Sequence, residues 1–355
     1  MARRVVEMYE LPKRIDTEFF DSLPEEERFG RLGIWELAYR DLRNHEVTLA
    51  EEADLWQLTF NEETIFPEAY RTTAKNVLEN GKGGRIQNRY GLTGKGVKVA
   101  VIDKPLQPEH PEFASKLTLI EVEPGDERNQ YIDFHGMTCA SLLAGKTCGA
   151  APDAELVYFM IPNTGDRKEL SKYALMALQK IVEYNTEHST EPIRLVSWSG
   201  GFVQEDMEER NRLVATLDGM GCYEVDATMF MRDYGGLEYH PYARAGESRY
   251  TLSTWQLQNL ERNKLRPGFA DWFNSCCYVP ATACTCASED IQGGFIHWGK
   301  TVSESWTIPQ LVGAMATLLQ KDASVTYAEF TRLAKGCPRK DGYVVLDMDW
   351  VIENL

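Results

Sequence analysis

Short apolar runs alternate with segments of helical spacing along most of the chain. The runs at 97–103, 154–161 and 193–200 are rich in valine, isoleucine and leucine, which predicts buried parallel strands. Apolar residues recur at helical spacing over 168–185, and a further helix is predicted to begin at Phe134. Because strands and helices alternate, we predict an α/β fold in which helices cover both faces of a mainly parallel sheet.

The first 85 residues differ from the rest of the chain in their pattern of charged and apolar positions. Residues 1–85 carry acidic clusters, and apolar positions such as those of 31–43 recur at helical spacing. Glycine-rich turns at 81–84 and 91–96 follow this region. We therefore predict a small, mostly helical accessory or pro-like region at 1–85 and a catalytic domain at 86–355. We favour an accessory region that packs on the domain and stays attached over one that is removed.

The charge balance narrows the class of partner. The 355 residues carry a formal net charge of −16. This excess of acid excludes a nucleic-acid binder or a protein that docks on anionic membranes, because both need a basic face. No apolar run reaches the roughly 18–20 residues that a membrane span requires, and no apolar segment follows the N-terminal arginines as in a signal peptide. We expect a cytoplasmic protein; its oligomeric state is not indicated.

The cysteines predict packing and not metal binding. Eight cysteines in a chain of this length are too few for a disulfide scaffold. A local cluster lacks the paired spacing typical of zinc sites and consists of Cys276, Cys277, Cys284 and Cys286. We expect Cys284 and Cys286 to be small buried residues on one face of a strand, and we predict no metal site from the sequence.

Three polar residues stand at the ends of predicted elements. Asp103 ends an apolar run, His135 begins a helix, and Ser305 precedes an alanine-rich helix. Ligands of parallel sheets bind beyond the carboxyl ends of the strands, where such residues converge. An acid, an imidazole and an alcohol predict nucleophilic acyl transfer: the serine attacks, the histidine takes its proton, and the aspartate orients the imidazole.

Four segments in this order carry a resemblance to a known family. The segment 91–113 ends a strand in the acid and continues to H-P-E-F, and 134–145 contains H-G-M-T-C-A-S-L-L-A-G. The segment 196–201 reads V-S-W-S-G-G, and 303–320 reads S-E-S-W-T-I-P-Q-L-V-G-A-M-A-T-L-L-Q. The chain from about residue 88 onward resembles the subtilases, the subtilisin-like serine proteases, which share the order Asp, His, Ser.

The resemblance implies a fold, a reaction and a binding mode. The implied fold is a three-layer α/β/α sandwich, and the implied reaction is peptide-bond hydrolysis by Asp103, His135 and Ser305 through an acyl-enzyme. The substrate peptide or protein would add as a strand beside Ser197, Ser199, Gly200 and Gly201. Cys139 would lie beneath the catalytic histidine. Many subtilases bind calcium on surface loops, but no ligand set can be traced here, and the reaction requires no cofactor.

Departures from the family pattern concern the acid and the oxyanion. Lys104 follows the acid, and we expect it either to stabilise the charged aspartate or to compete with His135 for it. Glu304 precedes the serine, where a carboxylate would oppose the developing negative charge. The family's oxyanion asparagine is missing, which places Asp233 at its position with Thr228 as a second candidate donor.

These departures leave two functions open. The first is a serine endopeptidase of narrow specificity, since the divergent segment 222–275, with a helical stretch at 252–264, lies where substrate pockets are built. The second is a catalytically impaired pseudoprotease that acts as a peptide-binding or regulatory module. A lipase-type hydrolase is disfavoured, because Ser305 lacks the G-x-S-x-G context and that fold places its acid and histidine after the serine.

Overall fold

The central element is a five-stranded sheet in which every pairing is parallel. The computed structural model describes residues 12–15, 34–37, 40–47, 57–60, 63–68, 90–237, 276–280, 284–289, 293–298, 304–340 and 343–355. The sheet has the order β6-β7-β5-β8-β9 and consists of β5 (Lys98–Asp103), β6 (Leu117–Glu121), β7 (Glu155–Met160), β8 (Ile193–Trp198) and β9 (Tyr223–Asp226). All five carboxyl ends therefore lie at the same edge.

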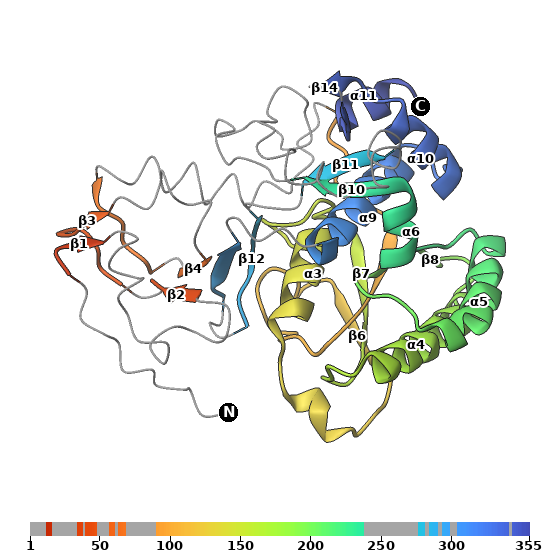
Figure 1. Cartoon of the computed structure of the whole chain (residues 1–355), viewed down its shortest axis with the longest axis horizontal. Coiled ribbons are helices and arrows are strands. Elements are labelled where there is room, and N and C mark those ends of the chain that lie inside the picture. Colours follow the sequence, from red (N-terminus) through yellow and green to blue (C-terminus); the bar gives the residue numbers. More distant parts are fainter. Residues whose placement is uncertain are drawn as a thin grey trace, which may run out of the picture.

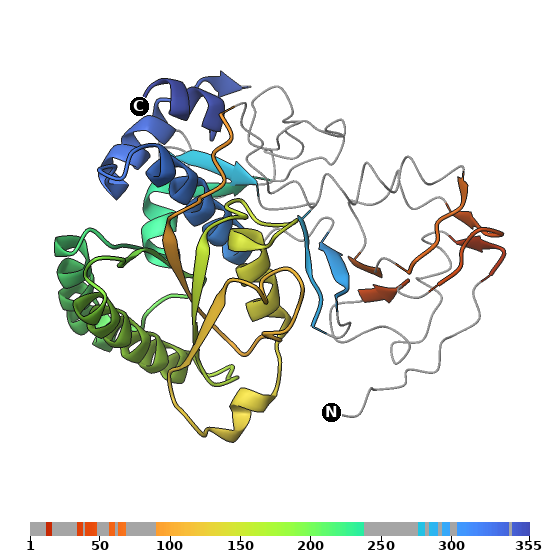
Figure 2. The same cartoon turned by 180° about the vertical axis from the view of Figure 1, so that it is seen from behind.

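Helices cover both faces of this sheet. Figures 1 and 2 show α4 and α5 on one side and α3 with α9 on the other. The main helices are α3 (Phe134–Ala144), α4 (Arg167–Glu187), α5 (Met207–Gly219) and α9 (Glu304–Lys321). Shorter helices are η3 (Glu127–Gln130), η4 (Gln204–Asp206), α6 (Ala227–Asp233), α10 (Tyr327–Lys335) and α11 (Met348–Glu353). The predicted three-layer sandwich with a parallel sheet is confirmed.

Two apolar cores follow from the period of two along each strand. On β5, Val99 and Val101 pack into the core shared with α3 and α9. Ala100 and Ile102 of the same strand pack into the core shared with α4 and α5. Both sets are buried, which explains why the strand reads as a continuous apolar run and not as an alternating one.

The helix α9 packs closely on the end of α3 and on the segment after it, because Gly313 has no side chain. A Cβ added to Gly313 would lie 2.6 Å from the Cβ of Ala150 and 3.0 Å from the carbonyl oxygen of Leu143, inside van der Waals contact. This close approach carries the start of α9, with Ser305, toward the start of α3, with His135. The side of α9 that carries Gly313 is therefore a packing side.

Three smaller sheets complete the described part of the chain. One has the order β10-β11-β15-β14 and comprises β10 (Tyr234–Leu237), β11 (Cys277–Pro280), β15 (Tyr343–Val345) and β14 (Arg339–Lys340). Another has the order β12-β13-β4-β2 and comprises β12 (Cys284–Ala287), β13 (Phe295–Trp298), β4 (Gln57–Phe60) and β2 (Ile34–Glu36). The third pairs β1 (Arg14–Ile15) with β3 (Glu46–Val47). All eight cysteines are buried thiols, and Cys284 and Cys286 lie on β12, as expected.

The N-terminal region corrects one prediction. The segment 31–43 has apolar residues at helical spacing, but within it Ile34–Glu36 forms the strand β2, so the helical prediction is wrong at these residues. The reason is tertiary: β2 pairs with β4, and β4 pairs antiparallel with β13, which follows the catalytic region's β12. Figure 1 shows β2 and β4 on the same side of β12, with β13 between β12 and β4 in the sheet order. A pairing partner more than 200 residues away leaves no mark on local periodicity.

Candidate active site

The candidate site lies at the carboxyl edge of the central sheet. Asp103 is the last residue of β5, the middle strand. His135 stands in the first turn of α3, and Ser305 stands in the first turn of α9. Three segments far apart in the sequence therefore meet at one rim of the sheet, where ligands of parallel sheets bind.

The aspartate and the histidine form a direct pair. Nδ1 of His135 lies 2.8 Å from Oδ1 and 3.0 Å from Oδ2 of Asp103, whose side chain is 1% exposed. The side chain of Asp133 caps α3 by accepting the main-chain N–H of His135 at 2.8 Å, so the residue enters the helix at a fixed angle. A hydrogen bond to Asp103 requires the proton on Nδ1. The other ring nitrogen, Nε2, is then the proton acceptor.

The environment makes this imidazole more basic than usual. Burial by itself lowers the pKa of His135, but the charge of Asp103 and its hydrogen bond outweigh burial, so the net pKa is raised. Asp133 raises the pKa further and Lys104 lowers it. A general base works best with a pKa near the working pH, so two nearby charges of opposite sign adjust the base without touching the ring.

Lys104 does not compete for the acid through its ammonium group. Its Nζ lies 3.3 Å from Oδ2 of Asp133, whereas its main-chain N–H donates to Oδ1 of Asp103 at 2.8 Å. The expected competition with His135 is therefore wrong, because the long side chain turns toward the helix cap. The aspartate keeps both oxygens within reach of Nδ1. The side chain of Lys104 acts on His135 through its charge, and its main-chain N–H supports Asp103 directly.

Ser305 is held close to this pair by its neighbours. The ring of Trp306 lies 5.5 Å from that of His135, centroid to centroid. The carbonyl of Ser305 accepts a hydrogen bond of 3.0 Å from the hydroxyl of Ser199 and a longer one of 3.4 Å from the thiol of Cys139. Contacts from α3 and from the end of β8 therefore set the position of the main chain at Ser305.

Cys139 lies beneath the histidine, as the resemblance implies. Its Sγ is 3.8 Å from Nδ1 of His135 and 3.5 Å from Oγ of Ser199. Burial, and next the charge of Asp103, raise the pKa of this thiol well above its usual value. The group is therefore a neutral thiol at ordinary pH, and it packs the floor of the site instead of acting as a nucleophile.

The predicted substrate strand divides into a buried and an accessible part. Ser197 pairs with β5 on one side and β9 on the other, and its side chain is 1% exposed, so its assignment to substrate binding is wrong. The residues Ser199, Gly200 and Gly201 follow the last paired residue, Trp198, and are half-buried or exposed. The indole of Trp198 lies under Gly200 so closely that a Cβ there would overlap it. Only glycine fits at this position.

The two candidate oxyanion donors lie in different places. Asp233 ends α6, where its carboxylate binds Lys335 at 2.7 Å and Arg232 at 2.9 Å. Partial burial raises the pKa of Asp233, but these ion pairs outweigh it and hold the pKa below the usual value. An ionised carboxylate cannot donate a hydrogen bond, so this surrounding argues against Asp233 as a donor.

Thr228 is better placed. It is exposed in the first turn of α6, and its Oγ1 lies 3.9 Å from the point where a Cβ would stand on Gly201. The main-chain N–H of Ala227 donates to the carbonyl of Gly200 at 2.9 Å, which joins the start of α6 to the substrate segment. The hydroxyl of Thr228 therefore borders the accessible part of that segment. The side chain of Glu304 is outside the described residues, as is the segment 238–275.

A buried charge cluster beside this strand was missed from the sequence. Arg210 on α5 binds Oε2 of Glu224 at 2.5 Å and Oδ2 of Asp226 at 3.1 Å. All three side chains are at most 7% exposed. The sequence signal that could have found them is the pair of acidic residues in the strand run Y-E-V-D. A carboxylate buried in a sheet needs a charged or hydrogen-bonding partner.

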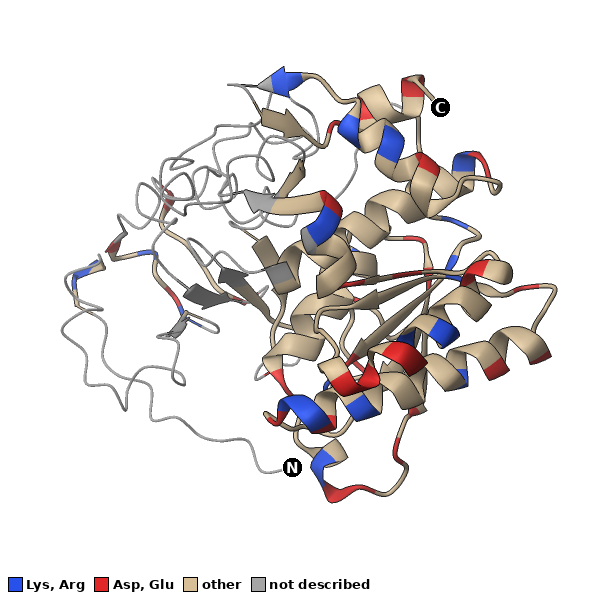
Figure 3. Cartoon of the chain, turned by 45° about the vertical axis from the view of Figure 1, so that its right-hand side comes forward, with Lys and Arg blue, Asp and Glu red and all other residues tan. Residues whose placement is uncertain are grey.

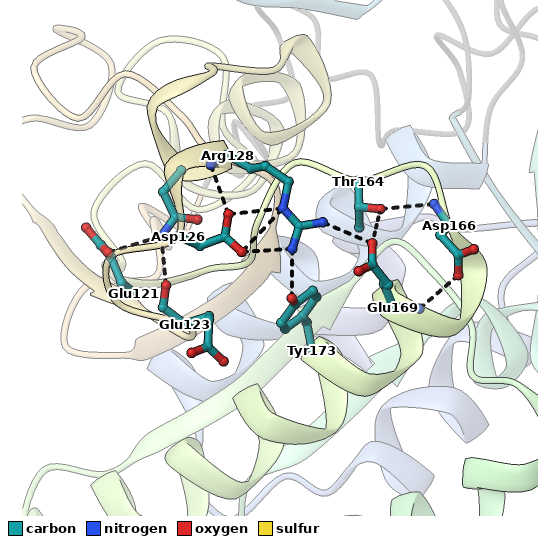
Figure 4. Close-up of polar contacts among 9 residues, drawn as sticks. Glu121, Glu123, Asp126, Arg128, Thr164, Asp166, Glu169 and Tyr173 are labelled. Atoms are coloured by element: carbon teal, nitrogen blue, oxygen red, sulfur yellow. Dashed lines mark hydrogen bonds and ion pairs between the residues drawn. The ribbon is translucent and has the colours of Figure 1, made fainter.

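Two loops at the same edge are tied together, as Figure 4 shows. Arg128, in the loop between β6 and α3, binds Oδ2 of Asp126 at 2.8 Å and Oε2 of Glu169 at 3.0 Å. It also donates to the hydroxyl of Tyr173 at 2.9 Å. Glu169 in turn accepts the hydroxyl hydrogen bond of Thr164, in the loop after β7. The arginine thus links both loops to α4.

Ligands for a metal ion converge at one point among the residues that the structure describes. These are Asp103, His135 and Cys139, whose ligand atoms all lie within 4.8 Å of one another. One oxygen, one nitrogen and one sulfur do not suit calcium, which takes six to eight oxygen ligands. The trio is the same acid and imidazole with the thiol beneath them. Within the same described residues, no helix is long and apolar enough to cross a bilayer.

Part of this chain is similar to known proteins. Residues 94–219 match the model of the subtilase family. The chain is 29% identical over 155 residues to "Serine protease AprX" of Bacillus subtilis (strain 168), a match that covers 41% of this chain and 33% of that protein. The aligned region thus spans a third of this relative.

Solved structures show the same architecture. The "self-cleaved protease domain of PatA" superposes with a TM-score of 0.50 at 17% identity and covers 74% of this chain and 98% of that domain. A "cold adapted subtilisin-like serine proteinase" gives a TM-score of 0.48 at 15% identity, over 71% of this chain and 86% of that one. The PatA domain therefore shares the fold of this chain, an α/β/α sandwich. Within this fold, residues 94–219 are similar to the subtilase family.

Proposed function

We propose that this protein is a serine endopeptidase. The observation that carries the proposal is the hydrogen-bonded pair of Asp103 and His135 at the sheet edge, with Ser305 anchored beside it by Ser199. The family match and the AprX relative support this class of reaction. The acid, imidazole and alcohol provide every proton transfer of acyl transfer, so the proposed reaction needs no cofactor.

The proposed reaction has two halves. Oγ of Ser305 attacks the peptide carbonyl carbon while Nε2 of His135 takes the hydroxyl proton, and Asp103 stabilises the imidazolium that forms. The carbon–nitrogen bond then breaks as the imidazolium gives its proton to the leaving amine. Water attacks the acyl-enzyme in the same way, with His135 again accepting and returning the proton. The product acid leaves and the hydroxyl of Ser305 is restored.

The developing oxyanion needs donors in the right place. We assign this role to the main-chain N–H of Ser305 and to the hydroxyl of Thr228. A threonine hydroxyl can rotate to donate, which the ion-paired carboxylate of Asp233 cannot. Removal of one oxyanion donor costs roughly 10²–10³-fold in rate, a magnitude known from subtilisin itself.

The substrate we propose is an extended peptide with basic residues. It would add beside Ser199, Gly200 and Gly201, using main-chain hydrogen bonds. The chain carries a net charge of −16, and Figure 3 shows charged residues along the outer helices and loops while the central strands are mostly uncharged. An acidic protein attracts cationic substrates and raises their association rates. The eight thiols agree with a reducing compartment such as the cytoplasm.

Covalent labelling with a fluorophosphonate probe tests this function. The probe phosphonylates a serine only when a base activates it, so we expect the full chain to label at Ser305 and the Ser305→Ala variant to remain unlabelled. Digestion of short basic peptides should disappear in the same variant. A folded protein that does not label between pH 5 and 9, yet binds extended peptides, would instead be the pseudoprotease.

A further inference from the structure

The buried cluster of Arg210, Glu224 and Asp226 lies beside the candidate active site, where a role in stability alone would not require it to be. Arg210 projects from α5 and meets the end of β9, the strand next to the substrate strand. One guanidinium faces two carboxylates, all at most 7% exposed. Burying an arginine together with two acidic side chains carries a desolvation penalty that can exceed the attraction between them, so stability alone does not explain the cluster at this point.

The contacts of Asp226 supply that reason. One carboxylate oxygen, Oδ2, faces Arg210 at 3.1 Å, while the other, Oδ1, caps α6 by accepting the main-chain N–H of Met229 at 2.6 Å. The main-chain N–H of Thr228 also bonds to this carboxylate. Asp226 is therefore a bridge between Arg210 and the first turn of α6, and Thr228 stands in that turn.

Arg210 also reaches the continuation of the substrate strand. Its guanidinium lies 5.9 Å from the ring centroid of Phe202, the residue directly after Gly201. On the same side, the N–H of Ala227 donates to Gly200. One buried arginine thus contacts both segments between which an oxyanion would lie: the substrate segment and, through Asp226, the start of α6.

We propose that Arg210 is a positioning residue that holds the hydroxyl of Thr228 at the oxyanion position, acting through Asp226 and the first turn of α6. This inference rests on the proposed peptidase function. Arg210 does not touch the reacting atoms. It contributes a rigid, fixed-angle guanidinium that can bind Asp226 and face Phe202 at the same time, which a lysine ammonium cannot do.

A double-mutant cycle tests the proposal on the full chain. The second-order rate constant for fluorophosphonate labelling is measured for wild type, Arg210→Lys, Thr228→Val and the double variant. We expect Thr228→Val to slow labelling by about 100-fold and Arg210→Lys by about 10-fold. If Arg210 acts through Thr228, the double variant labels as slowly as Thr228→Val alone, because no positioned hydroxyl remains to lose.

Two further variants separate positioning from general support. Thr228→Ser keeps the hydroxyl, so it should label within a few-fold of wild type and should regain the full sensitivity to Arg210→Lys. Arg212→Lys changes an exposed arginine on the same helix and should label like wild type. With a peptide that wild type cleaves, Arg210→Lys should lower kcat and leave KM unchanged. Should Arg210→Lys not fold, Asp226→Asn replaces it, since asparagine keeps the cap but not the ion pair.

The possible outcomes test the positioning role of Arg210 separately from the proposed peptidase function. If wild type labels at Ser305 and the two substitutions multiply in the double variant, Arg210 supports the fold in general and the inference is overturned while the peptidase stands. If Arg210→Lys labels as fast as wild type, the inference is likewise overturned while the peptidase function stands. A wild-type chain that neither labels nor cleaves peptides overturns the proposed function, and the positioning role with it.

Discussion

The hydroxyl of Ser199 donates a hydrogen bond of 3.0 Å to the main-chain carbonyl of Ser305. In a regular helix this carbonyl would accept the N–H of the residue four positions later. That residue is Pro309, which has no N–H, so the end of β8 supplies a donor that α9 lacks. The substrate segment and the proposed nucleophile are thereby joined directly, and the proline in the helix has a role in the site.

This relationship predicts the behaviour of Ser199→Ala. Loss of the hydroxyl removes one donor from a carbonyl that the helix cannot satisfy, so we expect unfolding to become easier by about 1 kcal/mol. We also expect kcat to fall by about 10-fold, because the main chain at Ser305 is less well fixed. Adding Pro309→Ala restores a helical N–H and should recover part of both losses. Unchanged stability and kcat in Ser199→Ala would contradict this role.

Two charges near His135 predict opposite shifts of the pH profile. Activity requires the neutral imidazole, so the rate falls as the pH drops below the pKa of His135. Lys104 lowers this pKa, so Lys104→Met should move the acid limb to higher pH. Asp133 raises the pKa, so Asp133→Asn, which keeps the helix cap, should move the limb to lower pH. The measurement is kcat/KM from pH 5 to 9, and shifts in the same direction would refute the assignment.

We predict that only glycine is tolerated at position 136, next to the histidine. A Cβ at this position would overlap the carbonyl of Lys104 and the hydroxyl of Tyr158, which itself donates to that carbonyl. We expect Gly136→Ala to destabilise the protein by about 1–3 kcal/mol and to displace His135, with a loss of labelling. Gly165→Ala is the matched control, because a Cβ there meets no atom within 4 Å. The free energies of unfolding of both variants, measured with denaturant, test this prediction.

We predict that the free energy of unfolding depends on pH through Glu224. Burial and the neighbouring charge of Asp226 raise the pKa of Glu224 to about 8. The folded state then holds a proton that the unfolded state releases at its ordinary, lower pKa. This contribution is full below the unfolded value and is lost as the pH rises toward about 8. Glu224→Gln imitates the protonated acid, so its unfolding free energy should fall less than that of wild type between pH 5 and 8.

The strand β4 predicts that the N-terminal region stays attached. It lies between β2 and β13, with Leu58 opposite His297 and Phe60 opposite Phe295, so its removal would open the edge of the β12–β13 hairpin. We expect the purified active chain and its Ser305→Ala variant to have the same full-length mass. A shorter active chain, cut between residues 80 and 95 only when Ser305 is present, would show self-processing instead.

Much of the fold follows from local pattern. The strand that ends at Asp103 and the helix that begins at Phe134 could be predicted, because buried parallel strands are continuous apolar runs and helices repeat at 3.6 residues. The boundaries of two other elements were less exact: β8 ends at Trp198 and not at Gly200, and α9 begins at Glu304, so Ser305 lies inside the helix and not before it. The candidate acid, base and nucleophile stand at or near the ends of such elements, and the resemblance of four segments to the subtilases singled them out.

The surroundings of the site depended on tertiary contacts. Residue order does not reveal that the Lys104 ammonium turns to Asp133, that Asp233 is neutralised by Lys335 from 102 positions away, or that Thr228 borders Gly201 instead. The strand at Ile34–Glu36 likewise forms only because a partner is present. Periodicity reports which face of an element is buried, whereas the partner of a charge or a strand edge is set by what the folded chain brings beside it.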